Sequence, residues 1–146
     1  MIDDVQLVQD VYRSTVEHGR PPRVSELALA LGEEPADVIA AFKRLSSRRL
    51  LALAPDSGEI VMAPPFSAVP TGFLVTAGGR SYFANCVWDA FGVAAALHAD
   101  AVVEASCACC GDPMTLVVRD GQPQTEPAIA HFAVPAAQWW DNITYT

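Results

Sequence analysis

A cysteine and an aspartate three residues apart are the pair in this sequence best suited to do chemistry. Cys86 and Asp89 lie within the segment 82–92, which reads YFANCVWDAFG and is rich in aromatic side chains. Side chains three residues apart share one face of a helix, so the thiol and the carboxylate can converge on a single bound atom. The spacing therefore predicts a soft nucleophile beside a group that carries protons.

The surroundings of this pair suggest how each group is protonated. Cys86 is expected at the start of a short helix, where free backbone N–H groups and the helix dipole favour a thiolate. Asp89 has aromatic neighbours, and loss of hydration among them would raise its pKa and favour a proton-holding role. The competing interpretation is that Cys86 is a small buried hydrophobic residue, which is the commoner fate of a lone cysteine.

A second group of cysteines lies in the segment 106–113, SCACCGDP, between two predicted strands. Cys107 and Cys110 have the Cys-x-x-Cys spacing of half a zinc site. A tetrahedral site needs two more ligands, and a turn with incidental cysteines is the alternative. A further hypothesis is that one of these thiols completes the site of Cys86. The candidates for additional zinc ligands are Cys86, His98, Cys109 and His131.

Length and composition define the broad class of protein. The chain has 146 residues, of which 51% are hydrophobic, so one medium or two small folded domains are expected. No apolar run approaches the roughly 20 residues that a membrane helix needs, and the acidic start, MIDD, lacks the features of a signal peptide. We therefore expect a cytoplasmic protein without membrane association. Because three of the four cysteines are crowded at 107–110, metal binding or redox chemistry fits better than a disulfide framework.

Residues 1–63 are predicted to form a winged helix-turn-helix module. Apolar residues recur at helical spacing over 3–18, a second short helix is expected to end at Leu31, and a third follows Pro35. Two apolar stretches, 50–54 and 59–62, then flank an Asp-Ser-Gly turn, which is typical of a hairpin. Three helices followed by a hairpin give the winged arrangement.

DNA binding through residues 35–49 is the functional alternative for this module, and the sequence disfavours it. A recognition helix reads bases from its N-terminal part, which here is the acidic stretch 33–37, EEPAD, and the net charge is −8. The module is therefore expected to serve as a packing lid. Seven of the nine basic residues nevertheless lie in it: Arg13, Arg20, Arg23, Lys43, Arg44, Arg48 and Arg49.

The second half of the chain is predicted to be an α+β domain. A connector at 64–71, PPFSAVPT, contains three prolines that keep it extended. In residues 72–146 we expect several antiparallel strands packed around one helix that runs from Cys86 to about Leu97. A helical turn after Pro135 would carry two tryptophans. The expected strands are 73–76, 81–84, 101–105, 114–119, 128–134 and 143–146.

The motifs of this chain resemble those of the organomercurial (alkylmercury) lyase family. The resemblance is carried by the winged-helix part, by the connector residues PFS and PT within 65–71, by the segment 85–90, NCVWDA, and by the tail 139–143, WWDNI. The Cys-x-x-Asp segment in this setting is its specific part. The winged helix alone is a weak signal.

The resemblance implies a mechanism and roles for two residues. In the family, one cysteine attacks mercury, a second cysteine joins it as a ligand, and an aspartate passes protons so that the carbon leaves as a hydrocarbon. By position, Cys86 corresponds to the attacking cysteine and Asp89 to the aspartate. The chemistry is consistent, since soft mercury prefers thiolates, a positioned acid can protonate the carbon, and an apolar pocket suits an alkyl or aryl group.

The same resemblance implies partners and a structural role for another cysteine. No cofactor is required, Hg(II) is the product and a ligand, and the expected partners are a small organomercurial substrate and cellular thiols. A family cysteine at about the position of Cys107 is usually structural. Zinc held by Cys107 and Cys110 stays an additional hypothesis.

One departure from the family pattern concerns the second ligand. The family's second catalytic cysteine is expected just after the tryptophan-containing tail, where this sequence reads ITYT at 143–146. We expect either that residues after Thr146 supply it or that this homologue lacks it. Without it, Cys86 could still bind mercury, but cleavage should fall steeply.

The predicted function is thus protonolytic cleavage of carbon–mercury bonds to a hydrocarbon and Hg(II). The alternative from another class is a non-catalytic metal- or mercury-binding sensor, such as a transcription regulator with a winged helix. A family member that acts on a different substrate is a third hypothesis.

Overall fold

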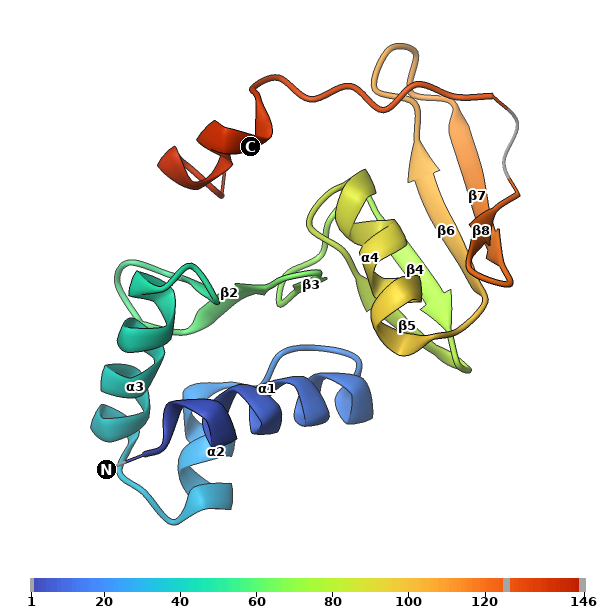
Figure 1. The fold of residues 1–146 in the computed structure, drawn as a ribbon. Coiled ribbons are helices and arrows are strands. Elements are labelled where there is room, and N and C mark those ends of the chain that lie inside the picture. Colours follow the sequence, from blue (N-terminus) through green and yellow to red (C-terminus); the bar gives the residue numbers. More distant parts are fainter. Residues whose placement is uncertain (1, 125–126, 145–146) are drawn as a thin grey trace.

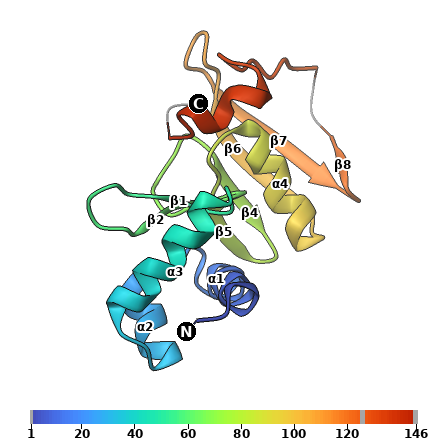
Figure 2. The same ribbon diagram turned by 60° about the vertical axis from the view of Figure 1, so that its left-hand side comes forward.

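The computed structural model describes residues 2–124 and 127–144 and divides them between two clusters of buried side chains. Three helices come first in the chain: α1 (Asp4–His18), α2 (Val24–Leu31) and α3 (Pro35–Ser47). They group at one end of the molecule, and α4 (Val87–Leu97) with the larger sheet lies at the other (Figures 1 and 2). The three helices lie where the hydrophobic periodicity predicts them.

The ends of α1 show how the sequence sets a helix length. The Asp3 carboxylate accepts a hydrogen bond from the Gln6 N–H at 2.8 Å, which satisfies a donor that the first turn leaves free. At the other end Gly19 adopts φ +80°, and its N–H donates to the Thr15 carbonyl. A left-handed glycine of this kind ends helices because it has no Cβ to clash.

A short antiparallel sheet follows the helices. It contains β1 (Ala52–Leu53), β2 (Ile60–Ala63) and β3 (Phe66–Ser67), in that order. The predicted hairpin is confirmed as β1 and β2, and β3 is formed inside the proline-rich connector. The first buried cluster joins this sheet to the helices and includes Leu7, Val11, Leu27, Val38, Phe42, Leu45, Leu51 and Ile60.

The larger sheet is antiparallel throughout, in the order β5-β4-β6-β7-β8, which confirms an α+β fold with one helix packed on the sheet. Its two tight turns use residues at positive φ: Gly78-Gly79 between β4 and β5, and Asp120-Gly121 between β7 and β8. Helix α4 connects β5 to β6 and covers one face (Figure 1). The strands are β4 (Leu74–Ala77), β5 (Arg80–Phe83), β6 (Ala101–Ser106), β7 (Pro113–Arg119) and β8 (Gln122–Pro123).

Aromatic residues connect the two buried clusters. The Phe66 ring lies between those of Tyr12 and Tyr82, at centroid distances of 6.3 and 5.3 Å. The Tyr12 hydroxyl donates to the Pro64 carbonyl at 2.7 Å, and the Tyr82 hydroxyl donates to the Val16 carbonyl at 3.2 Å. Because each phenol combines packing with a hydrogen bond, α1 is held against the connector and against β5.

Helix α4 also packs closely on the connector at a glycine. A Cβ added to Gly92 would lie 3.1 Å from the Cβ of Pro65, which is tighter than ordinary van der Waals contact. The absence of a side chain therefore lets α4 approach the connector. This close contact holds α4, which begins next to Cys86, against the connector.

Two of the strands expected near the C-terminus are wrong. Residues 128–134 form no strand, and Ile129 is 94% exposed, because no sheet edge lies alongside to satisfy its backbone groups. Ile143 and Thr144 lie in a turn, and the last two residues of the expected strand 143–146 fall outside the described residues. The helical turn is confirmed as a 3-10 helix, η1 (Ala136–Asp141), which begins after Pro135.

Candidate functional site

The start of α4 places Cys86 and Asp89. β5 ends at Phe83, and Cys86 is the N-cap of the helix, with extended φ and ψ of −152° and −178°. The Cys86 carbonyl already accepts the first helical hydrogen bond, from the Ala90 N–H at 2.9 Å. Asp89 lies in the first turn, so the predicted position of the thiol at a helix start is confirmed.

Both side chains line one cavity of about 310 Å³. Three parts of the chain enclose it: the end of β2 with the connector, the start of α4, and the C-terminal segment around η1. Most of the lining is aromatic or aliphatic, so the cavity suits an apolar group. The lining residues are Met62, Pro64, Asn85, Cys86, Trp88, Asp89, Phe132, Trp139, Trp140, Ile143 and Thr144.

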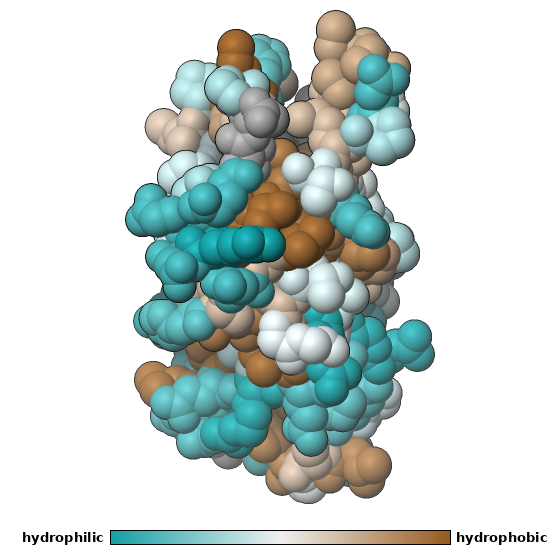
Figure 3. Space-filling view, turned by 90° about the vertical axis from the view of Figure 1, so that its right-hand side faces the viewer, coloured by the Kyte–Doolittle hydropathy of each residue, from teal (hydrophilic) through white to brown (hydrophobic). Residues whose placement is uncertain are grey.

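A larger hollow of about 680 Å³ lies between α4 and the β7–β8 turn, and it contains neither Cys86 nor Asp89. Figure 3, viewed from the right-hand side of Figure 1, shows an apolar region in the middle of this face with hydrophilic residues on both sides of it. The hollow is lined by three alanines with Phe91, Val118 and Pro123, and by the polar residues His98, Asp100 and Asp120, but it contains no cysteine. We therefore take the smaller cavity as the candidate site, because it contains both Cys86 and Asp89.

The carboxyl of Asp89 is held by its neighbour Asn85. The Asn85 amide nitrogen donates to the Asp89 carboxylate at 2.8 Å and, more weakly, to the Phe66 carbonyl at 3.4 Å. Burial raises the pKa of Asp89, and the Asn85 hydrogen bond lowers it in part. The predicted upward shift of this pKa is confirmed in direction. Such a carboxyl can accept and return a proton closer to neutral pH than an exposed aspartate can.

The thiol of Cys86 behaves differently from the expectation. Burial raises its pKa, and the nearby negative charge of Asp89 adds to this, while the backbone N–H groups of Asp89 and Trp88 act in the opposite direction. The expectation that the helix start would favour a thiolate is therefore wrong in its net direction. Desolvation of the charged form outweighs the helix N-terminus, so Cys86 rests as a thiol.

Two residues of this site were missed as functional residues. Asn85 could have been found, because it directly precedes Cys86 and lies only four residues before Asp89 in the sequence. Tyr12 gave no such signal, since it lies 77 positions away in the sequence and fits the apolar face of α1. Burial raises the pKa of Tyr12, and the charge of Asp89 raises it further, which places this phenol within electrostatic reach of the carboxyl.

The remaining cysteines lie elsewhere, in the turn between β6 and β7. None of them lines the Cys86 cavity, so the hypothesis that one completes that site finds no support. In residues 2–124 and 127–144, no group of three or more His, Cys, Asp or Glu side chains is placed to hold a metal ion. A tetrahedral zinc site that includes His98 or His131 is therefore not formed there, and His98 instead caps the end of α4. Metal binding by Cys107 and Cys110 alone stays a prediction.

In this turn the pKa values of Cys107 and Cys110 shift in opposite directions, and only that of Cys107 shifts opposite to that of Cys86. The backbone N–H groups of Cys110 and Cys109, together with the Cys110 thiol, lower the pKa of Cys107. For Cys110, the Asp112 N–H favours the thiolate, but hydrogen bonds to the Asp112 side chain and to Cys107 leave its pKa raised. One thiol of the pair is thus activated at the expense of the other.

Comparison with known proteins defines the class. The sequence model of the alkylmercury lyase family, MerB, matches residues 66–146, which is more than half of the chain. The protein belongs to the alkylmercury lyase family. The matched region contains Cys86, Asp89 and the cysteine turn.

The fold is also similar to that of a solved family protein, described as the mercury-bound form of MerB2. The TM-score is 0.63 with 27% sequence identity, over 84% of this chain and 58% of that chain. Coverage of this extent reaches well into residues 1–65, so the helical module is part of the likeness. This chain spans little more than half the length of the solved one. A search of curated protein sequences found no match.

None of the described helices is both long enough and apolar enough to cross a lipid bilayer. This agrees with the absence of a long apolar run in the sequence.

Proposed function

We propose that the protein cleaves carbon–mercury bonds by protonolysis, releasing a hydrocarbon and Hg(II), with Cys86 as nucleophile and ligand and Asp89 as proton relay. The observation that carries the proposal is the single cavity into which a thiol and a carboxyl of raised pKa both open, in a member of the alkylmercury lyase family. The apolar lining suits an alkyl or aryl substituent.

The first step is attack on the organomercurial substrate. The Cys86 sulfur bonds to mercury, the substrate's former thiolate ligand leaves, and the thiol proton passes to the Asp89 carboxylate. Although burial holds the proton on the free thiol, coordination to a soft metal removes it. The raised pKa of Asp89 helps at this point, because a more basic carboxylate accepts the proton more readily.

The second step breaks the carbon–mercury bond. The Asp89 carboxyl returns its proton to the carbon, the electron pair of the bond becomes the new C–H bond, and Hg(II) stays on sulfur. Asn85 keeps the carboxyl oriented through its 2.8 Å hydrogen bond. Among the residues that the structure describes, Cys86 is the one cysteine that lines the cavity. A second sulfur ligand would come either from residues after Thr146 or from a small cellular thiol.

Hydrocarbon release tests the proposal. The protein is incubated with methylmercury or phenylmercury and excess thiol, and methane or benzene is measured by gas chromatography. Release is expected for the wild type and for Cys109→Ser, whose thiol is exposed and outside the cavity, and it should be lost in Cys86→Ser. Turnover that persists in Cys86→Ser would remove this thiol from the mechanism.

For residues 1–63 we propose a winged helix-turn-helix that acts as a lid and does not bind DNA. Two of the basic residues near its recognition helix are already engaged: Arg44 pairs with Asp4 at 2.7 Å, and Arg48 lies 3.7 Å from the same carboxylate. Tyr12 from this module instead contacts Pro64, which lines the cavity. Salt-sensitive binding to duplex DNA would contradict the lid role.

We place the protein in the reducing cytoplasm, since all four cysteines are free.

A further inference from the structure

Three of the four cysteines lie in the cysteine turn, residues 107–112 between β6 and β7, which the proposed reaction does not use. The turn has a defined shape. Its flanking residues Ser106 and Pro113 are paired across the strands, the Cys107 N–H donates to the Asp112 carbonyl at 2.8 Å, and the Gly111 N–H donates to the Cys107 carbonyl at 2.8 Å. Because Gly111 has φ +78°, the chain can turn back at this point.

The turn brings two sulfur atoms together and surrounds them with hydrogen-bond donors. The backbone N–H groups of Cys110 and Cys109 and the Cys110 thiol lie near enough to the Cys107 sulfur to lower its pKa. The Cys110 sulfur in turn accepts from the Asp112 N–H. Successive N–H groups that point at one atom form a concave site for negative charge, so the backbone favours a thiolate at Cys107, with the Cys110 thiol beside it.

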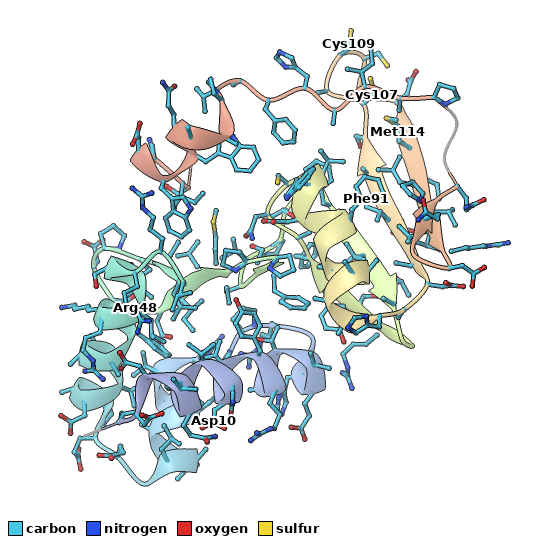
Figure 4. All side chains as sticks on the ribbon, viewed as in Figure 1. Asp10, Arg48, Phe91, Cys107, Cys109 and Met114 are labelled. Atoms are coloured by element: carbon cyan, nitrogen blue, oxygen red, sulfur yellow. The ribbon has the colours of Figure 1, made fainter. Side chains whose placement is uncertain are left out.

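The third cysteine of the turn is not part of this pair. Cys109 is exposed, and Figure 4 shows Cys107 and Cys109 in the turn at the end of the β6–β7 hairpin. The side chains of Cys109 and Cys110 are reachable from solvent, and Cys107 is partly so. Replacing the Cys109 side chain therefore provides a matched control that leaves the backbone donors in place.

We propose that Cys107 and Cys110 form a second soft-metal site that holds one Hg(II) ion between two thiolates. In the binding step both thiols lose their protons, each sulfur forms one bond to mercury, and the two protons and the two former ligands of the ion are released. The assignment rests on the proposed function for the source of Hg(II), which is the product left on Cys86.

Ligand number favours mercury over zinc at this site. Zinc in structural sites takes four ligands, whereas no group of three candidate ligands is assembled anywhere in the described part of the chain. Two thiolates suffice for a soft ion that accepts linear coordination, and sulfur ligands favour soft ions. The pair therefore fits Hg(II) and leaves zinc under-coordinated.

The topology places both sulfur sites at one end of the domain. Helix α4 begins next to Cys86, and strand β6, which runs back in the opposite direction, ends next to Cys107. Figure 1 accordingly shows the start of α4 and the β6–β7 turn at the same end of the sheet. Mercury that leaves the cavity would not need to cross the molecule to reach the turn.

The test uses Cys86→Ser, which cannot perform the proposed cleavage, so its result is independent of that function. HgCl₂ is added at one equivalent in the presence of millimolar monothiol, and retained mercury is measured by native mass spectrometry and by sulfur-to-mercury charge-transfer absorption. Cys86→Ser is expected to retain one Hg(II) per chain, and Cys86→Ser/Cys109→Ser should do the same. Adding Cys110→Ser should weaken retention at least about tenfold, because two linked sulfurs act at high effective concentration.

Three results would overturn the site: loss of mercury from Cys86→Ser itself, undiminished retention after Cys110→Ser, or zinc retained in preference to mercury. Cys107→Ser serves as a second variant, and circular dichroism establishes that each protein is folded. If Cys86→Ser retains mercury while the wild type releases no hydrocarbon, the second site stands and the cleavage proposal fails.

Discussion

The cavity at the start of α4 and the cysteine turn shift the pKa of a thiol in opposite directions, upward for Cys86 and downward for Cys107. In the cavity, burial raises the pKa of the Cys86 thiol despite the helix N-terminus. In the turn, backbone N–H groups lower the pKa of Cys107, which has little burial to oppose them. The difference shows that donors activate a cysteine only where desolvation is small. A thiol that stays protonated until a metal ion binds suits catalysis, and an accessible pair in which one thiol is activated suits capture.

The largest effect is expected from removing the acid, because cleavage in the cavity needs a proton carrier and metal binding in the cysteine turn does not. Asp89→Asn keeps the size of the side chain but removes the proton carrier, so hydrocarbon release should fall about 10²- to 10⁴-fold, as for other lost general acids. Gas chromatography of the released hydrocarbon measures it. Mercury retention by the cysteine turn should not change. Near-normal cleavage by Asp89→Asn would show that Asp89 is not the relay.

Alkylation rates test the contrast in protonation directly. The thiolate is the reactive form, so Cys107 should react with iodoacetamide at lower pH than an ordinary thiol, and Cys86 should require higher pH. Mass spectrometry of the two peptides over a pH series gives both profiles. We expect Cys107 to react faster than Cys86 near neutral pH, since the thiolate fraction falls as the pKa rises above the pH. Equal profiles would contradict the comparison.

Asn85→Ala should test how the Asn85 hydrogen bond sets the pKa of Asp89 in the cavity. The Asn85 hydrogen bond lowers the pKa of Asp89, so its removal should raise that pKa further and move the limb of the cleavage pH profile governed by Asp89 toward higher pH. A loss of about 1 kcal/mol, or a few-fold in rate, is typical for one such hydrogen bond. A rate loss without a shifted profile would reduce Asn85 to a structural role.

The smallest effect is expected from Tyr12→Phe. This change removes the hydroxyl that donates to the Pro64 carbonyl and leaves the ring packed against Phe66. Unfolding by urea should show a destabilisation of about 0.5–1.5 kcal/mol, with a modest loss of cleavage because Pro64 lines the cavity. Cys107 alkylation is the control and should stay as in the wild type. An altered Cys107 profile would mean that the two regions are coupled.

Much of the fold could be predicted because its signals are local. Helical periodicity and Gly19 set α1, paired turn residues set the β4–β5 hairpin, and the position of Cys86 at a helix start follows from its neighbours. The expectation for 128–134 failed because alternating residues make a strand only when a neighbouring edge pairs with them. Nothing within those seven residues shows whether such an edge exists.

The candidate site divides in the same way. Cys86 is the N-cap of α4, Asp89 lies in its first turn and Asn85 comes directly before the cap, so their sequence spacing carries the information. Tyr12 and the walls of the cavity come from distant parts of the chain, and only packing brings them to the start of α4. The net protonation of Cys86 was predicted wrongly for this reason, since the helix N-terminus is visible in the sequence and the extent of burial is not.

The order of residues by itself thus determined which atoms could react and on which turn they are displayed, because covalent spacing and helix geometry act over a few residues. The tertiary structure alone decided which of the cysteines is enclosed by aromatic walls and which is left in solvent. Hydration of a charged sulfur depends on everything within several ångströms, and most of those neighbours are remote in the chain. That physical difference places one thiol in an enclosed cavity and another in an open turn.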